Sequence, residues 1–143
     1  MRIAHRYTLY FAWLLVCVGT LISLYYSDIM HKEPCHLCWY QRICLFPLIF
    51  SLGIAAYRGF HGIAPYLLPQ SILGLLIALY QICIQEIPSW GGIDICGSGP
   101  SCSEKSLIGL GPITFPMLSA AGFLILTLLL FTSLYLSTVE KLK

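Results

Sequence analysis

The chain has 143 residues, of which 58% are hydrophobic and 10% are charged, and its formal net charge is +2. Its mean hydropathy is +0.82. A water-soluble domain of this length needs a polar surface that 8 basic and 6 acidic side chains do not provide. The composition therefore predicts a chain that lies in a lipid bilayer. The small, unclustered positive charge argues against nucleic acid as a partner.

Four apolar runs are each long enough to cross the hydrocarbon core, which takes roughly 20 helical residues. The runs cover about 7–27, 39–57, 63–84 and 113–137. The first run is longer than the apolar part of a typical signal peptide and no small-residue cleavage motif follows it, so we expect it to be retained. Backbone polar groups in lipid must be bonded within the chain, which favours helices. The sequence predicts one all-α integral membrane domain over 1–143, a four-transmembrane-helix bundle, with kinks at Pro47 and Pro116.

Lysine and arginine are distributed unevenly between the two sides of this bundle. Five lie on the side of the termini and two on the other side: Arg2, Arg6, Arg58, Lys141 and Lys143 against Lys32 and Lys105. Because positive residues are enriched in cytoplasmic loops, we expect both termini to be cytoplasmic. The segments 28–38 and 85–112, which carry four of the seven cysteines, would then be extracytoplasmic.

The stretch from Pro34 to Arg42 places a C-x-x-C pair at the expected start of the second helix. Such a pair can cycle between dithiol and disulfide, and the positive end of the helix dipole beside Cys38 favours the thiolate that the cycle needs. Arg42 follows one turn later on about the same face. A cation in a membrane helix needs a partner, and a thiolate at Cys38 or a polar head group held beside it would serve. The alternative is a static disulfide staple, with Arg42 reaching to lipid phosphates.

A second pair of cysteines, Cys96 and Cys102, lies in the longer outer segment. Four cysteines allow three connectivities, and the short spacings favour Cys35–Cys38 and Cys96–Cys102. Disulfides persist outside the cytoplasm, and two pairs on one membrane face indicate a relay by thiol–disulfide exchange. A zinc site is disfavoured because the spacing of Cys96 and Cys102 is wider than that of a zinc knuckle, so we expect no metal.

Such a relay needs an electron acceptor. The chain has no G-x-G-x-x-G or other phosphate-cradling loop, which argues against a nucleotide-bound NAD or flavin. A lipid-soluble quinone needs no such fold, and it could accept electrons at Cys38 with Arg42 at its carbonyl oxygen. The remaining cysteines lie within the expected spans, where we interpret them as small apolar residues: Cys17, Cys44 and Cys83.

These motifs resemble those of the DsbB/BdbC family of bacterial disulfide-generating quinone oxidoreductases, and the resemblance covers nearly the whole chain. It rests on four features: Ser-Leu-Tyr-Tyr-Ser at 23–27, Pro-Cys-His-Leu-Cys-Trp-Tyr-Gln-Arg at 34–42, the outer pair Cys96 and Cys102, and Gly-Pro-Ile-Thr-Phe-Pro at 111–116. The short spacing of the outer pair looks closer to the BdbC branch than to DsbB itself.

The resemblance implies a thiol:quinone oxidoreductase of the bacterial cytoplasmic (inner) membrane. It would reoxidise a DsbA-like thioredoxin-fold protein and pass the electrons to ubiquinone or menaquinone. Cys38 would be the quinone-proximal thiolate, Cys35 would exchange with the outer pair, and Arg42 matches the arginine associated with quinone. Cys96 would form the mixed disulfide with the partner, and Cys102 would resolve or relay.

Two other functions fit part of the pattern. A vitamin K epoxide reductase-like relay also combines a four-helix bundle with C-x-x-C and quinone, but it usually places the motif late in the bundle. A non-catalytic tetraspan protein with structural disulfides would need no electron acceptor. Loss of quinone consumption on removing Cys38 would separate the leading hypothesis from the second of these.

Overall fold

The structure is a computed structural model of the chain and describes residues 2–29, 31, 35–87 and 114–141. Its elements are α1 (Arg2–Leu24), the π-helical turn η1 (Tyr25–Ile29), α2 (His36–Arg58), the 3-10 turn η2 (His61–Ile63), α3 (Ala64–Glu86) and α4 (Phe115–Lys141). Four segments are long and apolar enough to cross a membrane: Tyr7–Ile29, His36–Arg58, Ala64–Glu86 and Phe115–Val139. The predicted fold class, an all-α membrane bundle of four helices, is confirmed for the described part of the chain.

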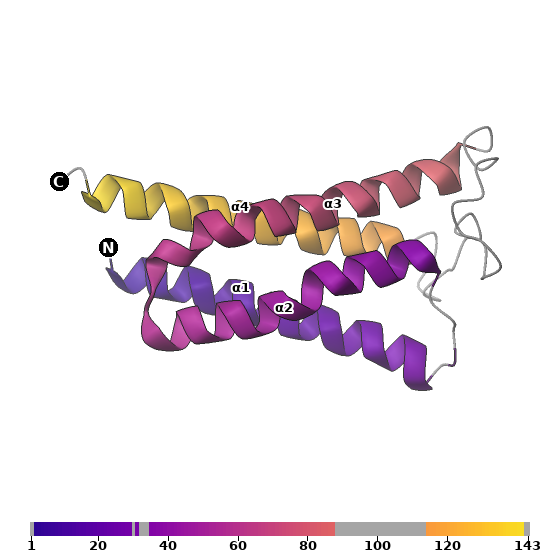
Figure 1. Cartoon of the computed structure of the whole chain (residues 1–143), viewed down its shortest axis with the longest axis horizontal. Helices are drawn as coiled ribbons and strands as arrows, with labels where there is room; N and C mark the ends of the chain where they lie inside the picture. The colour runs from indigo at the N-terminus through magenta and orange to yellow at the C-terminus, as the bar shows by residue number, and fades with distance from the viewer. Residues whose placement is uncertain (1, 30, 32–34, 88–113, 142–143) are drawn as a thin grey trace.

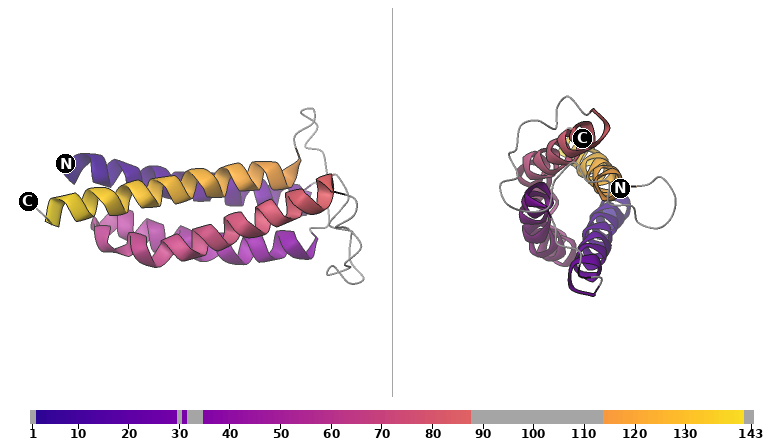
Figure 2. Two further views of the ribbon diagram at one scale, coloured as in Figure 1. Left: turned by 90° about the horizontal axis from the view of Figure 1, so that it is seen from above. Right: turned by 90° about the vertical axis from the view of Figure 1, so that its right-hand side faces the viewer.

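The helices run alternately up and down, so the start of α1 and the end of α4 lie at the same end of the bundle (Figure 1). Seen end-on, the helices form a ring in which α1 lies between α2 and α4, and α3 completes the ring between them (Figure 2). The start of α2, the end of α3 and the start of α4 therefore meet at one end, which we call the cysteine end. The ring of Tyr26 in η1 packs edge-on against Phe115 there, with centroids 4.6 Å apart.

Buried positions along the helices recur at intervals of three and four residues, the spacing of helices packed in a left-handed bundle. In α3 these positions are Ala64, Leu67, Ser71, Gly74, Ala78, Gln81 and Ile84. The main core is one cluster: Leu9, Ala12, Val16, Cys44, Leu48, Leu52, Ala56, Ala64, Leu67, Phe123, Leu126 and Leu130. A second, smaller cluster lies at the cysteine end: Cys35, Leu37 and Ile84, with Cys38, Ile77 and Tyr80 packed against it. The cysteine pair thus belongs to a smaller cluster, which Ile77 connects to the main core.

Helices α3 and α4 approach closely where Gly74 faces Phe123. A Cβ atom added at Gly74 would overlap the ring of Phe123, so only glycine leaves room for the ring. One turn away, the hydroxyl groups of Ser71 and Thr127 are hydrogen-bonded at 2.8 Å. Close approach of small residues and an interhelical hydrogen bond are the usual means by which helices associate in lipid.

The two prolines expected to kink their helices behave differently. Pro47 lies inside α2, and the side chain of Gln70 in α3 donates from Nε2 to the carbonyl oxygen of Cys44, 2.9 Å away, in the turn before this proline. The N–H that Pro47 lacks would have bonded the carbonyl oxygen of Ile43, and a neighbouring helix donates to the next carbonyl in the same turn, that of Cys44. Pro116 is the second residue of α4. The kink expected there is wrong, because proline is well accommodated in the first turn, whose N–H groups have no intrahelical acceptor.

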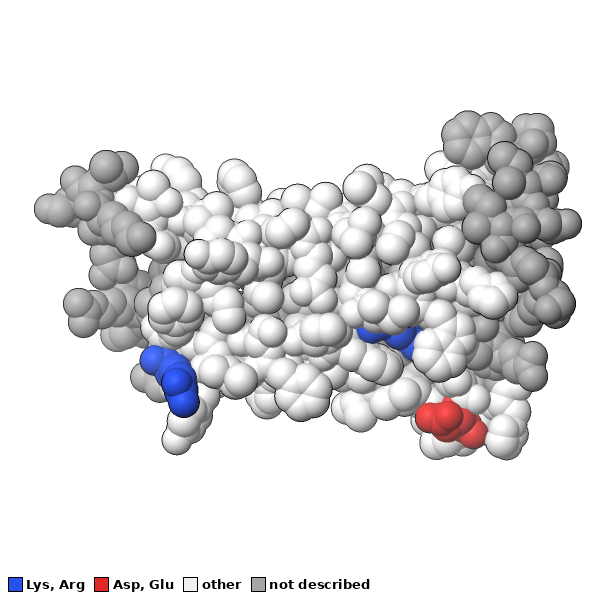
Figure 3. Space-filling model, viewed as in Figure 1, with Lys and Arg blue, Asp and Glu red and all other residues white. Residues whose placement is uncertain are grey.

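The outward surface of the bundle is apolar. Large side chains such as Phe50, Leu128 and Phe131 are more than half exposed, and only 22–33% of each membrane-spanning window is buried inside the protein. The face in Figure 3 is almost uncharged, with basic and acidic side chains confined to a few isolated places. A surface of this size and character is stable only in lipid. The chain is a multi-pass membrane protein.

Candidate active site

The two cysteines of the C-x-x-C pair lie in the first turn of α2. Cys35 is the N-cap residue, with extended backbone angles (φ −66°, ψ 166°), and its carbonyl oxygen accepts the first helical hydrogen bond from the N–H of Trp39 at 3.1 Å. An N-cap side chain lies over the first turn, which brings it beside the third helical residue, Cys38. The Sγ atoms of Cys35 and Cys38 are 3.2 Å apart, and both residues are free thiols in this structure.

The two sulfurs differ in environment. Cys35 is 8% exposed and Cys38 is half-buried. The pKa of Cys35 is raised above its usual value, first because its thiol donates a hydrogen bond to the sulfur of Cys38 and second because it is buried. Cys35 is therefore the protonated member of the pair, and Cys38, beside the N–H groups that open α2, is the sulfur better placed to carry negative charge.

A glutamine from α3 contacts both sulfurs. Gln81 Nε2 lies 3.3 Å from Cys35 Sγ and 3.4 Å from Cys38 Sγ, and the side chain is only 2% exposed. Its Oε1 accepts a hydrogen bond from Gln41 Nε2 at 2.9 Å. The Oε1 of Gln41 accepts in turn from the hydroxyl of Ser119 in α4. Side chains from α2, α3 and α4 therefore form one continuous polar connection that ends on the cysteine pair.

Arg42 is bound to the end of α1. Its Nε donates to Ser23 Oγ at 2.9 Å, and its terminal nitrogens donate to the carbonyl oxygen of Ser23 at 2.8 Å and to Ser27 Oγ at 3.4 Å. The guanidinium carbon also lies 5.5 Å from the ring centroid of Trp39, within cation–π range. Arg42 is 9% exposed, so its charge is held inside the bundle rather than extended to the membrane surface. Its partners are neutral oxygens of α1 and η1, which the sequence alone did not indicate.

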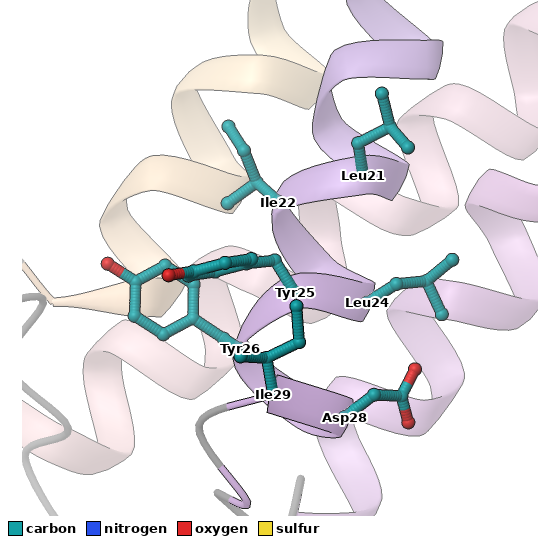
Figure 4. A pocket seen from close by; sticks show the side chains of 7 residues that line it. All are labelled: Leu21, Ile22, Leu24, Tyr25, Tyr26, Asp28 and Ile29. Atoms are coloured by element: carbon teal, nitrogen blue, oxygen red, sulfur yellow. The ribbon is translucent and has the colours of Figure 1, made fainter.

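An open, apolar hollow of about 500 Å³ lies on the same α1–η1 segment (Figure 4). It is lined by Leu21, Ile22, Leu24, Tyr25, Tyr26, Asp28 and Ile29. Neither Cys38 nor Arg42 is among these residues, so the hollow is separate from the sulfur chemistry.

The structure describes three of the five predicted site residues. Cys35, Cys38 and Arg42 come together at the cysteine end, whereas Cys96 and Cys102 lie outside the described residues, and their roles stay predictions. Cys44 is part of the main core. Cys17 and Cys83 are half-buried thiols. Within the described ranges, no three His, Cys, Asp or Glu side chains are grouped as a metal site requires.

Gln41, Gln81 and Ser119 are the site residues that sequence reasoning missed. A signal was present for the two glutamines, because each lies on the interior three-and-four spacing of its helix, where most other positions are apolar or small and Arg42 is the other polar member in α2. A polar residue inside a membrane helix is costly unless it has a partner. The identity of those partners, however, depends on which helices are neighbours.

Fold and site together define a class: a multi-pass membrane protein with a dithiol at the opening turn of its second helix. Residues 5–133 match the family "Disulfide bond formation protein DsbB". The chain belongs to this family, and its function lies in disulfide bond formation.

Curated relatives agree with this assignment. A "Probable disulfide formation protein" of Chlamydia trachomatis is 56% identical over 87% of this chain and 90% of its own length. Proteins with the same description from Chlamydia caviae and Coxiella burnetii are 52% and 45% identical, over 93% and 94% of this chain and 96% and 92% of their own lengths. No solved structure matches the chain significantly.

Proposed function

We propose that the protein is a thiol:quinone oxidoreductase. It reoxidises a DsbA-like thioredoxin-fold dithiol protein and passes the electrons to a membrane quinone, in the cytoplasmic (inner) membrane of a bacterium. The observation that carries the proposal is the pair of free sulfurs 3.2 Å apart in the first turn of α2, with Arg42 one turn further along the same helix. Membership of the DsbB family and the names of the relatives support it.

The pair itself performs the redox step. Oxidation joins the Cys35 thiol and the Cys38 thiolate in an S–S bond and releases two electrons and one proton. A bound quinone would supply the acceptor for both electrons. The proton that Cys35 holds at its Sγ, where the pKa is raised, and a second proton from water would complete the quinol. The dithiol of the partner, acting through Cys96 and Cys102, then reduces the new disulfide by exchange.

Arg42 is suited to hold a quinone carbonyl. Three of its five N–H groups are used by Ser23 and Ser27, and among the described residues the other two have no acceptor. A carbonyl oxygen beside Cys38 would accept from them, and the fixed positive charge would stabilise negative charge that develops on that oxygen. Ubiquinone and menaquinone both present such a carbonyl, so both belong in the test.

The experiment measures quinone consumption. The protein is purified in detergent, mixed with a reduced thioredoxin-fold dithiol protein, and supplied with ubiquinone or menaquinone while quinone absorbance is followed. We expect consumption by the wild type and none by Cys38→Ser. Cys83→Ser is the matched control, because it removes another half-buried thiol and should leave consumption unchanged.

The outer cysteines give a second, sharper comparison. With Cys96→Ser or Cys102→Ser, turnover with the protein partner should stop, while the reduced Cys35–Cys38 pair should still transfer its own two electrons to quinone once. Failure of the wild type to consume either quinone would contradict the proposal and favour a structural disulfide protein. Consumption that persists after Cys38→Ser would contradict the assignment of the electron donor.

A further inference from the structure

The hydrogen-bonded connection that ends on the cysteine pair has a direction. Ser119 donates to Gln41 Oε1, Gln41 Nε2 donates to Gln81 Oε1, and Gln81 Nε2 donates to the sulfurs. Gln41 and Gln81 are 7% and 2% exposed, so neither amide has water as an easy alternative partner. The bond between Gln41 and Ser119 also joins α2 to α4, which are not neighbours in the ring of helices (Figure 2).

The order of donors and acceptors along this connection determines whether the NH₂ group or the oxygen of the Gln81 amide faces the sulfurs. Gln81 Oε1 accepts from Gln41 at 2.9 Å. A thiol at Cys38 could donate to the same Oε1 only over 3.9 Å, whereas Gln81 Nε2 lies 3.4 Å from Cys38 Sγ. Turning Gln81 over would place its NH₂ group against that of Gln41, which is repulsive unless Gln41 turns as well. The orientation of Gln81 thus depends on Gln41, and that of Gln41 on its bond to Ser119.

An N–H donor aimed at sulfur acts differently on the two redox states. Hydrogen bonds to a thiolate are charge-assisted and favour it. The sulfur of a disulfide carries no charge and is a weak acceptor, so oxidation would leave the buried Gln81 amide poorly satisfied. A dithiol whose reduced form is stabilised is a stronger oxidant when it is a disulfide.

We propose that Gln81, oriented by Gln41 and Ser119, stabilises the thiolate of the reduced Cys35–Cys38 pair and thereby makes the pair both more reactive as a thiol and more oxidising as a disulfide. Gln81 contacts the reacting sulfurs directly, whereas Gln41 and Ser119 are positioning residues. The proposal deepens the proposed function, but it concerns the pair itself and is tested without quinone or a protein partner.

Other groups at the site also influence the charge on sulfur and must stay constant in the test. Arg42 lies one turn along α2 from Cys38, and Tyr80 of α3 packs against the small cluster. All variants keep both residues. They also carry Cys96→Ser and Cys102→Ser, so that only one cysteine pair can cycle.

The first measurement is the rate at which iodoacetamide alkylates Cys38 in the reduced, detergent-solubilised protein at one near-neutral pH, resolved by mass spectrometry. Gln81→Met keeps the volume and removes the donor, and we expect alkylation about tenfold slower, as for loss of one hydrogen bond to a charged group. Gln81→Glu places a carboxylate against the sulfurs and should slow alkylation further. The same variants, equilibrated in a glutathione redox buffer, should hold a larger fraction of the pair as disulfide than the wild type does.

The second measurement isolates the positioning role. Ser119→Ala should slow alkylation of Cys38 severalfold, Ser119→Thr should restore the rate, and Ser119→Ala should have no effect when Gln81 is already Met. Ser71→Ala is the matched control, because it removes another buried hydroxyl that bonds between α3 and α4, far from the sulfurs along the helix.

The outcomes separate clearly. Equal alkylation rates for wild type and Gln81→Met, or the same rate for Gln81→Glu and Gln81→Met, would overturn the role of the N–H donor. Slowing by Ser119→Ala that persists in the Gln81→Met protein would overturn the positioning role and indicate a general packing effect. A wild type that consumes no quinone but shows the Gln81 dependence would contradict the proposed function and leave this inference standing.

Discussion

The protonation of Cys35 depends mainly on its neighbour. The thiol of Cys35 donates to Cys38 Sγ, and this bond is the largest cause of its raised pKa, ahead of burial. A thiol reacts with alkylating agents only as the thiolate, so Cys35 should be nearly inert in the reduced protein.

Removing the acceptor should make Cys35 more reactive. In Cys38→Ala the pKa of Cys35 should fall towards its ordinary value, although burial still holds it up. Because a lower pKa gives more thiolate at any pH below it, alkylation of Cys35 should begin at lower pH in Cys38→Ala than in the reduced wild type. Site-resolved mass spectrometry across a pH series measures this, and an unchanged onset would show that burial alone sets the pKa.

The contribution of Arg42 to stability should depend on the shape of its guanidinium group as well as on its charge. Lysine keeps the charge but cannot reach Ser23 Oγ, the carbonyl oxygen of Ser23 and Ser27 Oγ at once. We expect Arg42→Lys to lower the free energy of unfolding in detergent by about 1.5–3 kcal/mol, the value of one hydrogen bond to a charged group. Arg58→Lys, at the exposed end of α2, should change it by less than about 0.5 kcal/mol. Equal effects of the two substitutions would contradict the bonded role of Arg42.

The sequence indicated only some of these residues. One local motif contains Cys35, Cys38 and Arg42. Their spacing in the sequence places them in neighbouring turns of one helix, so their proximity could be predicted. Gln81 and Ser119 reach the same site from other helices, and their contacts depend on the ring order of the bundle. No local pattern contains that order.

At the scale of the helices, the contact of Gly74 with Phe123 gives the clearest test of packing. Gly74→Ala places a methyl group where the ring lies, and Phe123 is only 4% exposed, so the ring has little room to move. Overpacking of this kind costs about 1–3 kcal/mol, measurable as a lower unfolding temperature in detergent.

Gly122→Ala is the matched control, one residue from Phe123 on α4. A Cβ atom there meets nothing within 4 Å, so alanine should be neutral or stabilise by up to about 1 kcal/mol through helix propensity. Equal effects of Gly74→Ala and Gly122→Ala would show that α3 and α4 are not packed as described.

The helices themselves were predictable because length and hydropathy decide them. Each expected run of roughly 20 apolar residues overlaps one described helix. Details that depend on single turns were not predictable in the same way. Pro116 was expected inside the fourth helix, but the helix begins at Phe115, and α1 continues into the wider turn η1.

For the molecule as a whole, the side on which the pair faces is the central topological prediction. Both termini should be cytoplasmic, because Arg2, Arg6 and Arg58 share their side with the C-terminal lysines. A fluorescent protein fused after Lys143 should fluoresce, and alkaline phosphatase fused after Ile87 should be active. The reverse result would place Cys35 and Cys38 in the cytoplasm, where disulfides rarely persist.

The two clusters of the interior should differ in how readily they open by local unfolding. Among the described residues, the cluster at the cysteine end has three buried members and the main core cluster has twelve, so the cysteine end should open locally at a smaller free energy while Leu48 and Leu130 stay packed. Backbone amides of residues 81–86 should then exchange with deuterium sooner than those of residues 70–75 in the same helix, and equal protection would argue for a single cooperative bundle. Such openings would uncover Cys35, which is 8% exposed in the closed state, for the brief interval in which a second sulfur can reach it.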